Sequence, residues 1–187
     1  MKKSVLKEYA KLIVNVGANV QKGQEVQITA GMDQPEFVTY VAEACYKAGA
    51  KRVIVEWVYQ PLTKLNIKYR SLRELSKLEE FEEAMLKYKL DTLPAMIHIK
   101  SSDPDGLKGI NQEKYSKASQ ARTKLTKPYR DQMDCKYQWC IAAVPGKGWA
   151  KKVFPGERAS VAIEKLWEAI LDTSRVNDDP VLAWKEH

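Results

Sequence analysis

The sequence predicts an α/β protein built on a mostly parallel sheet of about four strands. Helix-like and strand-like segments alternate four times along the chain, which is typical of parallel α/β domains. The strand-like segments 25–29 and 52–58 enclose one helix-like segment, as in a strand–helix–strand unit with a right-handed crossover. No repeat, low-complexity tract or internal linker divides the pattern.

The first expected elements are a helix and a strand. Apolar residues between Val5 and Val16 recur at the spacing of one helical stripe, and Gly17 is placed to end that helix. Residues 25–29 then alternate as a strand should.

A second helix is expected directly after this strand. Asp33 followed by Glu36 has the spacing of a capping box, and Pro35 is tolerated in the first helical turn. Gly49 stands where a C-terminal glycine belongs. The β-branched run 52–58 then predicts a strand buried on both faces, as in parallel sheets.

The middle of the chain is expected to be helical and heavily charged. Residues 61–90 carry helical apolar spacing, and Pro94 ends this helix before a third strand at 95–99. A further helix is predicted from about 107 to 124, with a break at Pro128.

The last expected elements complete the sheet. Residues 137–144 form the fourth strand, with Trp139 interpreted as a core residue, and a helix follows from about 158 to 172. We expect the first strand to lie centrally between the second and third. With helices on both faces, the architecture is Rossmann-like.

The sequence predicts one α/β domain over residues 1–176. Asp179 and Pro180 form a helix start, and the helix over 181–187 has only two turns. A helix that short is marginal unless it packs onto something. We therefore interpret 177–187 as the start of a linker or interrupted helix towards a missing C-terminal domain.

Composition indicates an ordinary soluble protein. The chain has 187 residues, of which 44% are hydrophobic and 29% charged. No apolar run approaches the roughly 20 residues needed to cross a bilayer, so no membrane partner is expected. Three cysteines give no disulfide framework. A cytoplasmic location is therefore expected.

The positive charge is concentrated in one segment. Residues 100–152 hold 12 Lys and Arg against 5 Asp and Glu, whereas the rest of the chain is balanced. Such a segment suits an anionic ligand, a nucleic acid or an acidic partner surface, and equally a solvated face.

Motifs for chemistry are nearly absent. His98 and His187 are the only histidines, and no His-Glu-x-x-His motif exists. Cys135 and Cys140 lack a second cysteine pair that would complete a zinc site. We therefore assign no catalytic residue and no metal ligand.

Three loops follow strands, where doubly wound folds bind ligands. They are 31–35, 101–106 and 145–148, and none carries a phosphate-binding fingerprint. The basic stretch 121–130 contains one aromatic residue and is a weak match to single-strand nucleic-acid binding, so nucleic acid is not favoured as a partner.

Several segments together resemble the thermophilic metallo-aminopeptidase family, also called aminopeptidase T-like or PepS-like. The most specific begins at Tyr137-x-Trp139-x-Ile141-Ala142-x-x-Pro145 and continues through Trp149-Ala150-x-x-Val153-Phe154-Pro155. Further matches are Leu6-x-x-Tyr9-Ala10-x-Leu12-Ile13-Val14, Asn19-Val20-x-x-Gly23-Gln24-x-Val26 and Ala42-x-x-Cys45-Tyr46-x-Ala48-Gly49-Ala50-x-x-Val53. Their order and spacing cover about 170 residues of the chain.

The resemblance implies the N-terminal, non-catalytic domain of an exopeptidase that removes N-terminal residues from peptides. It implies two divalent metal ions, of the zinc, cobalt or manganese type, bound by residues in the second half of a chain about twice this length. The implied partners are a peptide substrate and that missing domain, and homo-oligomerisation stays open. This chain alone is then expected to be inactive.

Five residues are candidates for a substrate cleft or a domain interface. They are Arg122, Lys124, Lys127, Arg130 and Trp149. The alternative function is a stand-alone α/β module that binds a nucleotide or RNA through the basic segment 100–152.

Overall fold

The structure, a computed structural model, describes residues 1–176, 180 and 184. The helix expected over residues 181–187, and most of the segment 177–180 that was expected to begin it, therefore lie outside the described residues. The chain forms two compact units. The sheet unit comprises residues 1–58, 95–104 and 138–187, and the helical unit comprises 59–94 and 105–137.

The described part of the sheet unit contains four parallel strands, as predicted. They are β1 (Glu25–Gly31), β2 (Arg52–Val58), β3 (Ala95–Lys100) and β4 (Trp139–Ala143). The strand order is β2-β1-β3-β4, so the expected central position of the first strand between the second and third is confirmed. The fold is therefore a parallel α/β sheet.

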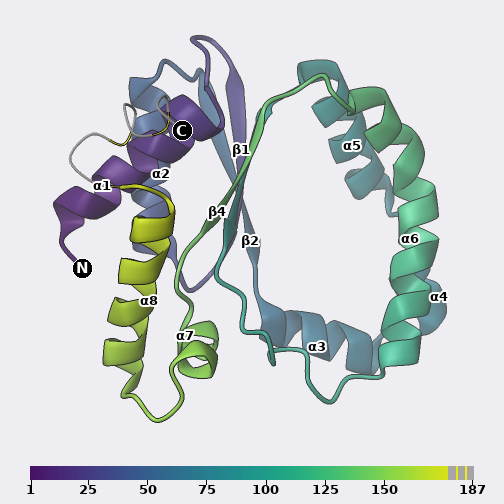
Figure 1. The fold of residues 1–187 in the computed structure, drawn as a ribbon. Coiled ribbons are helices and arrows are strands. Elements are labelled where there is room, and N and C mark those ends of the chain that lie inside the picture. Colours follow the sequence, from purple (N-terminus) through teal and green to yellow (C-terminus); the bar gives the residue numbers. More distant parts are fainter. Residues whose placement is uncertain (177–179, 181–183, 185–187) are drawn as a thin grey trace. The chain divides into compact units, whose positions relative to one another are not determined.

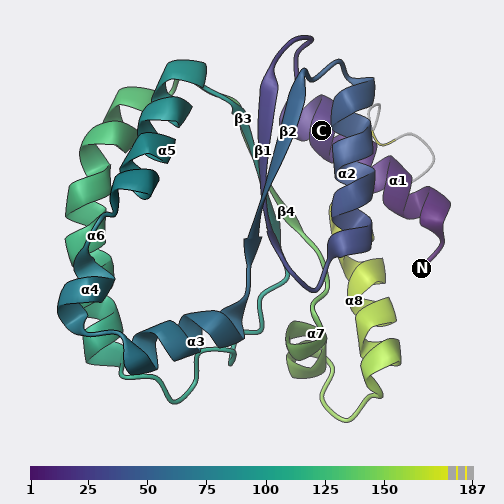
Figure 2. The same ribbon diagram turned by 180° about the vertical axis from the view of Figure 1, so that it is seen from behind.

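Within the sheet unit, helices lie on one face of the sheet. The helices of the unit are α1 (Lys3–Leu12), continued by the π-helix η1 (Ile13–Gly17), α2 (Pro35–Lys47), α7 (Lys147–Val153) and α8 (Ala159–Thr173). Figures 1 and 2 show α1, α2 and α8 on the same side of the strands. Alternate strand residues such as Ile28 and Ile97 are fully buried against them, because parallel-sheet side chains alternate between faces.

Three aromatic rings join the helices of the core. Tyr9 of α1, Phe37 of α2 and Trp167 of α8 lie with ring centroids 5.6 to 6.3 Å apart. The tilted and edge-on arrangements are those that aromatic quadrupoles favour. Burial raises the pKa of the Tyr9 hydroxyl, which donates a hydrogen bond to the Ala143 carbonyl at 3.1 Å.

The two outer strands are more exposed than predicted. β2 was expected to be buried on both faces, but it is an edge strand whose side chains are half-buried or exposed. Trp139 of β4 was expected in the core, but it is 60% exposed because β4 forms the other edge. A β-branched or aromatic run indicates a strand without indicating its place in the sheet.

The start of α2 differs from the predicted capping box. Gln34 is the N-cap residue and no side chain caps the helix, while Pro35 opens it as expected. Asp33 instead accepts a hydrogen bond from Ser101 of the loop after β3. Asp33 thus binds a distant loop instead of capping α2, although it also accepts a local hydrogen bond from Gln34 Nε2 at 3.1 Å. At the other end, Gly49 adopts the expected left-handed conformation, with φ +94°.

The helical unit contains three helices where one was expected over 61–90. They are α3 (Gln60–Tyr69), α4 (Leu72–Ser76) and α5 (Glu80–Thr92). Ser71 caps α4 by accepting from the Glu74 amide, and a capping box of Glu79 and Glu82 opens α5. These caps end one helix and begin the next, although the apolar spacing of the sequence continues across the helix boundaries.

The fourth helix of this unit is longer than predicted. α6 (Gln112–Met133) begins five residues later than expected and continues through Pro128, where a break was predicted. It contacts both α4 and α5, so tertiary packing outweighs the local cost of proline. Among the described residues, no helix has the length and apolar character needed to cross a bilayer.

Candidate functional site

The loops after β1, β3 and β4 meet at one edge of the sheet, as parallel strands require. Ser101 is buried, with 4% of its surface exposed. Its Oγ atom donates a hydrogen bond to Asp33 Oδ1 at 2.7 Å. Gln34 Nε2 donates to the Pro145 carbonyl at 3.2 Å. Three of the loops predicted from the sequence are therefore bound directly to one another at the carboxyl end of the sheet.

Gly146 permits this close approach. A Cβ atom built on Gly146 would stand 1.9 Å from the carbonyl oxygen of Ser101. At Gly31, a Cβ would meet Asp33 Oδ1 at 2.4 Å and Ser101 Oγ at 2.5 Å. The sequence located these loops, but no local signal joined Asp33 to Ser101. The sequence placed Pro145 and Gly146 in one of these loops, but it gave no sign of the close approach of Gly146 to Ser101.

A second candidate region lies in the helical unit. A cavity of about 390 Å³ is bounded by α3, α4, α5 and α6. Its charged lining residues are Arg70, Glu82 and Arg122, and its apolar lining includes the buried residues Ile67 and Ala118. Sequence reasoning identified Arg122 but not its neighbours in this cavity.

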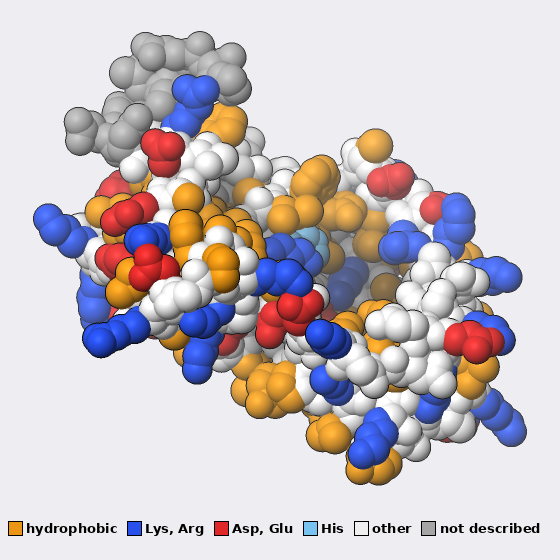
Figure 3. All heavy atoms as spheres, turned by 60° about the horizontal axis from the view of Figure 1, so that its bottom comes forward, with side chains coloured by type: hydrophobic (Ala, Val, Ile, Leu, Met, Phe, Trp, Pro, Cys, Tyr) orange, Lys and Arg blue, Asp and Glu red, His pale blue; other side chains and the backbone are white. Residues whose placement is uncertain are grey.

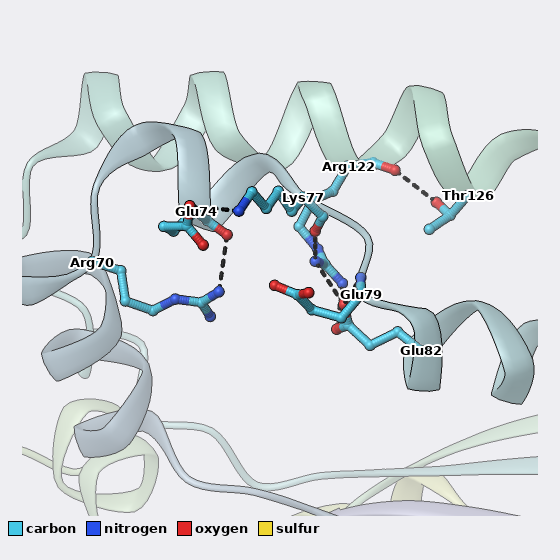
Figure 4. Close-up of polar contacts among 7 residues, drawn as sticks. All are labelled: Arg70, Glu74, Lys77, Glu79, Glu82, Arg122 and Thr126. Atoms are coloured by element: carbon cyan, nitrogen blue, oxygen red, sulfur yellow. Dashed lines mark hydrogen bonds and ion pairs between the residues drawn. The ribbon is translucent and has the colours of Figure 1, made fainter.

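Arg122 connects α6 to α5. Its Nη2 atom donates to Glu82 Oε1 at 2.7 Å and its Nη1 atom to Glu82 Oε2 at 3.1 Å, as Figure 4 shows. Nη1 also donates to the Lys77 carbonyl. The hydrogen bond from Arg122 is the largest influence that lowers the pKa of Glu82. The guanidinium is therefore already engaged inside the helical unit.

Two of the other basic candidates on α6, Lys124 and Lys127, do not share the face of Arg122. Residues of an α-helix advance by about 100° each, so Lys124 and Lys127 point away from it. Both are exposed, as is Arg130, and Lys127 forms an ion pair with Asp131. Lys124 and Arg130 are thus the candidates most accessible to a ligand or a partner.

Trp149 belongs to the sheet unit, whereas the four basic candidates belong to the helical unit. It lies on α7, is half-buried and packs against the main hydrophobic core. The structure therefore distributes the five candidates over both units rather than within one of them.

The basic segment is partly neutralised by acidic residues. Arg122 pairs with Glu82, Lys117 with Glu113 and Lys127 with Asp131. Figure 3 shows blue Lys and Arg side chains scattered among red Asp and Glu side chains on the face that it presents. This interspersed pattern weakens a single positive field of the kind that attracts nucleic acid.

Potential nucleophiles and metal ligands are dispersed. Burial raises the pKa of the Cys45 thiol to about 12, and it also raises that of Cys140, whereas Cys135 is exposed. His98 is half-buried within β3. Across residues 1–176, 180 and 184, no three His, Cys, Asp or Glu residues are grouped so that they could hold a metal ion. The described residues thus do not fit a metal centre.

Comparison with known proteins assigns the chain to a family. The model of the thermophilic metalloprotease family (M29) matches residues 2–187. The chain belongs to this family. The matched range includes all the segments on which the resemblance was based.

Relatives of this M29 chain are named aminopeptidases. It is 37% identical to aminopeptidase AmpS of Bacillus subtilis and 34% identical to aminopeptidase PepS of Streptococcus thermophilus. The alignments cover 97% and 99% of this chain but only 45% and 46% of the relatives. The chain thus spans about half the length of the curated relatives it matches.

A solved structure shares the fold of this M29 chain. Wild-type AmpT from Thermus thermophilus matches with a TM-score of 0.85 and 32% sequence identity. The match covers 99% of this chain and 46% of that chain. The α/β architecture of this chain is therefore shared with AmpT over the matched region.

Proposed function

We propose that this chain is the N-terminal, non-catalytic domain of an aminopeptidase that removes N-terminal residues from peptides. The observation that carries the proposal is the coverage of the match, which takes in nearly all of this chain and less than half of each aminopeptidase. The family description supports a metal-dependent enzyme. Two divalent metal ions, of the zinc, cobalt or manganese type, would then be bound outside this chain.

In this proposal, the domain contributes surfaces rather than reacting groups. Lys124 and Arg130 are exposed cations on α6, and Trp149 stabilises α7 against the core. Such residues suit a substrate cleft or an interface with the catalytic domain. A peptide substrate and the second half of the enzyme are the proposed partners, in the cytoplasm.

The test is to express the complete reading frame that contains this chain. Hydrolysis of leucine 4-nitroanilide is measured with added zinc, cobalt or manganese, and again after chelation. We expect metal-dependent release of 4-nitroaniline from the longer protein. A reading frame that ends at His187, or a longer protein without metal-dependent hydrolysis, would overturn the proposal.

A further inference from the structure

The outer edge of β4 is an exposed apolar strand edge. Among the residues that the structure describes, β4 pairs with β3 alone and forms the end of the sheet. The amide of Val144 donates a hydrogen bond to the Lys100 carbonyl, and the carbonyl of Gln138 accepts one from the Met96 amide. The backbone N–H and C=O groups of the even-numbered residues of β4 therefore point towards β3. By the alternation of a parallel strand, the backbone groups of Trp139 and Ile141 face outward.

The side chains on this edge are unusually apolar. Trp139 is 60% exposed and Ile141 is 58% exposed. The strand Trp139–Ala143 has no charged residue and no proline, whereas the opposite edge strand β2 carries Arg52 and Glu56. Sheet edges that face water are normally protected by charges, prolines or bulges. The β4 edge therefore has the character of a surface that is covered by another polypeptide.

An apolar groove continues this edge. It has a volume of about 350 Å³, and its lining includes Val16, Gly17, Ile141 and Trp184. Gly17 lets η1 approach β4 closely, because a Cβ there would stand 2.5 Å from Cys140 Sγ. Val16 is 39% exposed and Trp184 is 41% exposed, so the apolar surface extends from the strand across the groove.

We propose that the β4 edge and this groove bind the second half of the full-length M29 protein. This rests on the proposed function, since the occupant is the part of the relatives that the chain does not cover, more than half of their length. Trp184 lines the groove and donates its indole N–H to the Ser174 carbonyl at 2.9 Å. Trp184, the last residue that the structure describes, therefore lies beside the proposed docking surface.

The recognition chemistry follows from the two parts of the surface. The outward N–H and C=O groups of Trp139 and Ile141 accept an added extended strand, and their side chains supply its apolar contacts. The strand would end before Ala143, whose carbonyl already accepts from Tyr9. The groove beside η1 accepts one or two apolar side chains of the same segment. The docking segment is therefore expected to be extended and apolar on the side that meets β4.

The experiment expresses the second half of the same reading frame as a separate protein and titrates it with this chain. Binding is measured by calorimetry, and hydrogen exchange reports the Ile141 amide. We expect saturable binding that slows exchange at Ile141. The variant Ile141→Lys should weaken binding at least about tenfold, as loss of a central interface contact does. The control Trp57→Lys, an exposed residue of the opposite edge strand, should bind normally.

Three results would overturn the docking surface. They are no binding, equal weakening by Trp57→Lys, and dimerisation of this chain alone that Ile141→Lys abolishes. Peptidase activity of the second half is measured in parallel. Activity without docking at β4 rejects only this inference, whereas docking without activity rejects only the proposed aminopeptidase function.

Discussion

Arg122 of α6 holds Glu82 of α5 through two parallel hydrogen bonds, and the same guanidinium reaches the Lys77 carbonyl between α4 and α5. Both side chains are about one-third exposed, at 34% and 28%. One residue thus joins three segments of the helical unit. This explains why a basic residue chosen from the sequence as a cleft candidate also has a structural role.

Replacement of Arg122 by alanine should destabilise the helical unit. Loss of a partly screened bidentate pair and of a carbonyl contact is expected to cost about 1–2 kcal/mol. Urea unfolding followed by far-ultraviolet circular dichroism measures this. The matched control is Lys124→Ala on the same helix, which should change the unfolding free energy by less than about 0.5 kcal/mol. Equal effects of the two variants would contradict the structural role of Arg122.

The same pair predicts a pH dependence of stability. The pKa of Glu82 is lowered in the folded protein, first by the hydrogen bond from Arg122. Its contribution is therefore present above the unfolded pKa of about 4.3 and is lost as pH falls through the lower folded pKa. Stability should fall in this acidic range, and Glu82→Gln should show a smaller fall. An unchanged acid profile in Glu82→Gln would show that Glu82 does not contribute to it.

Gly146→Ala should disturb the loops at the carboxyl end of the sheet. The added Cβ would meet the Ser101 carbonyl oxygen, which is backbone and cannot rotate away. A loss of about 1–3 kcal/mol is expected from such overpacking. Gly156→Ala is the control for backbone strain without a steric contact, because φ is +90° there, which disfavours a side chain, but nothing lies within 4 Å of the added Cβ. Thermal unfolding should show the larger loss for Gly146→Ala, and the reverse order would contradict the close contact between the loops.

The three cysteines should react with iodoacetamide in a fixed order. Cys135 is exposed, whereas burial raises the pKa of Cys140 and raises that of Cys45 to about 12. Since the thiolate is the nucleophile, Cys135 should be labelled first and Cys45 last at pH 8. Peptide mass spectrometry of timed samples measures the order. Labelling of Cys45 in the folded protein as fast as that of Cys135 would contradict the buried position of Cys45. Labelling of the protein unfolded in urea is the control, in which all three cysteines should react.

The sequence predicted the parts of the fold that depend on local pattern. The β-branched and alternating runs located the four strands, and Pro35 and Gly49 correctly marked the two ends of α2. The three helices within 61–90 were missed because apolar spacing persists across their boundaries. The Ser71-x-x-Glu74 spacing, which is a capping signal, could have revealed the start of α4.

The site depended on relationships that local pattern does not contain. Asp33 had a nearby partner in Glu36 by spacing, but its partner in the structure is Ser101, 68 residues away. Trp139 has the sequence signature of a strand residue, and only the order of the strands makes it an edge residue. Strand order and partner choice are set by the packing of the whole sheet.

The most direct test of the proposed non-catalytic role is made on residues 1–187 alone. The purified chain is titrated with zinc, cobalt and manganese by calorimetry and assayed with leucine 4-nitroanilide at each metal concentration. We predict no stoichiometric metal binding and no hydrolysis above the rate without protein, because the proposal places the metal ligands outside this chain. Stoichiometric binding accompanied by metal-dependent hydrolysis would contradict it.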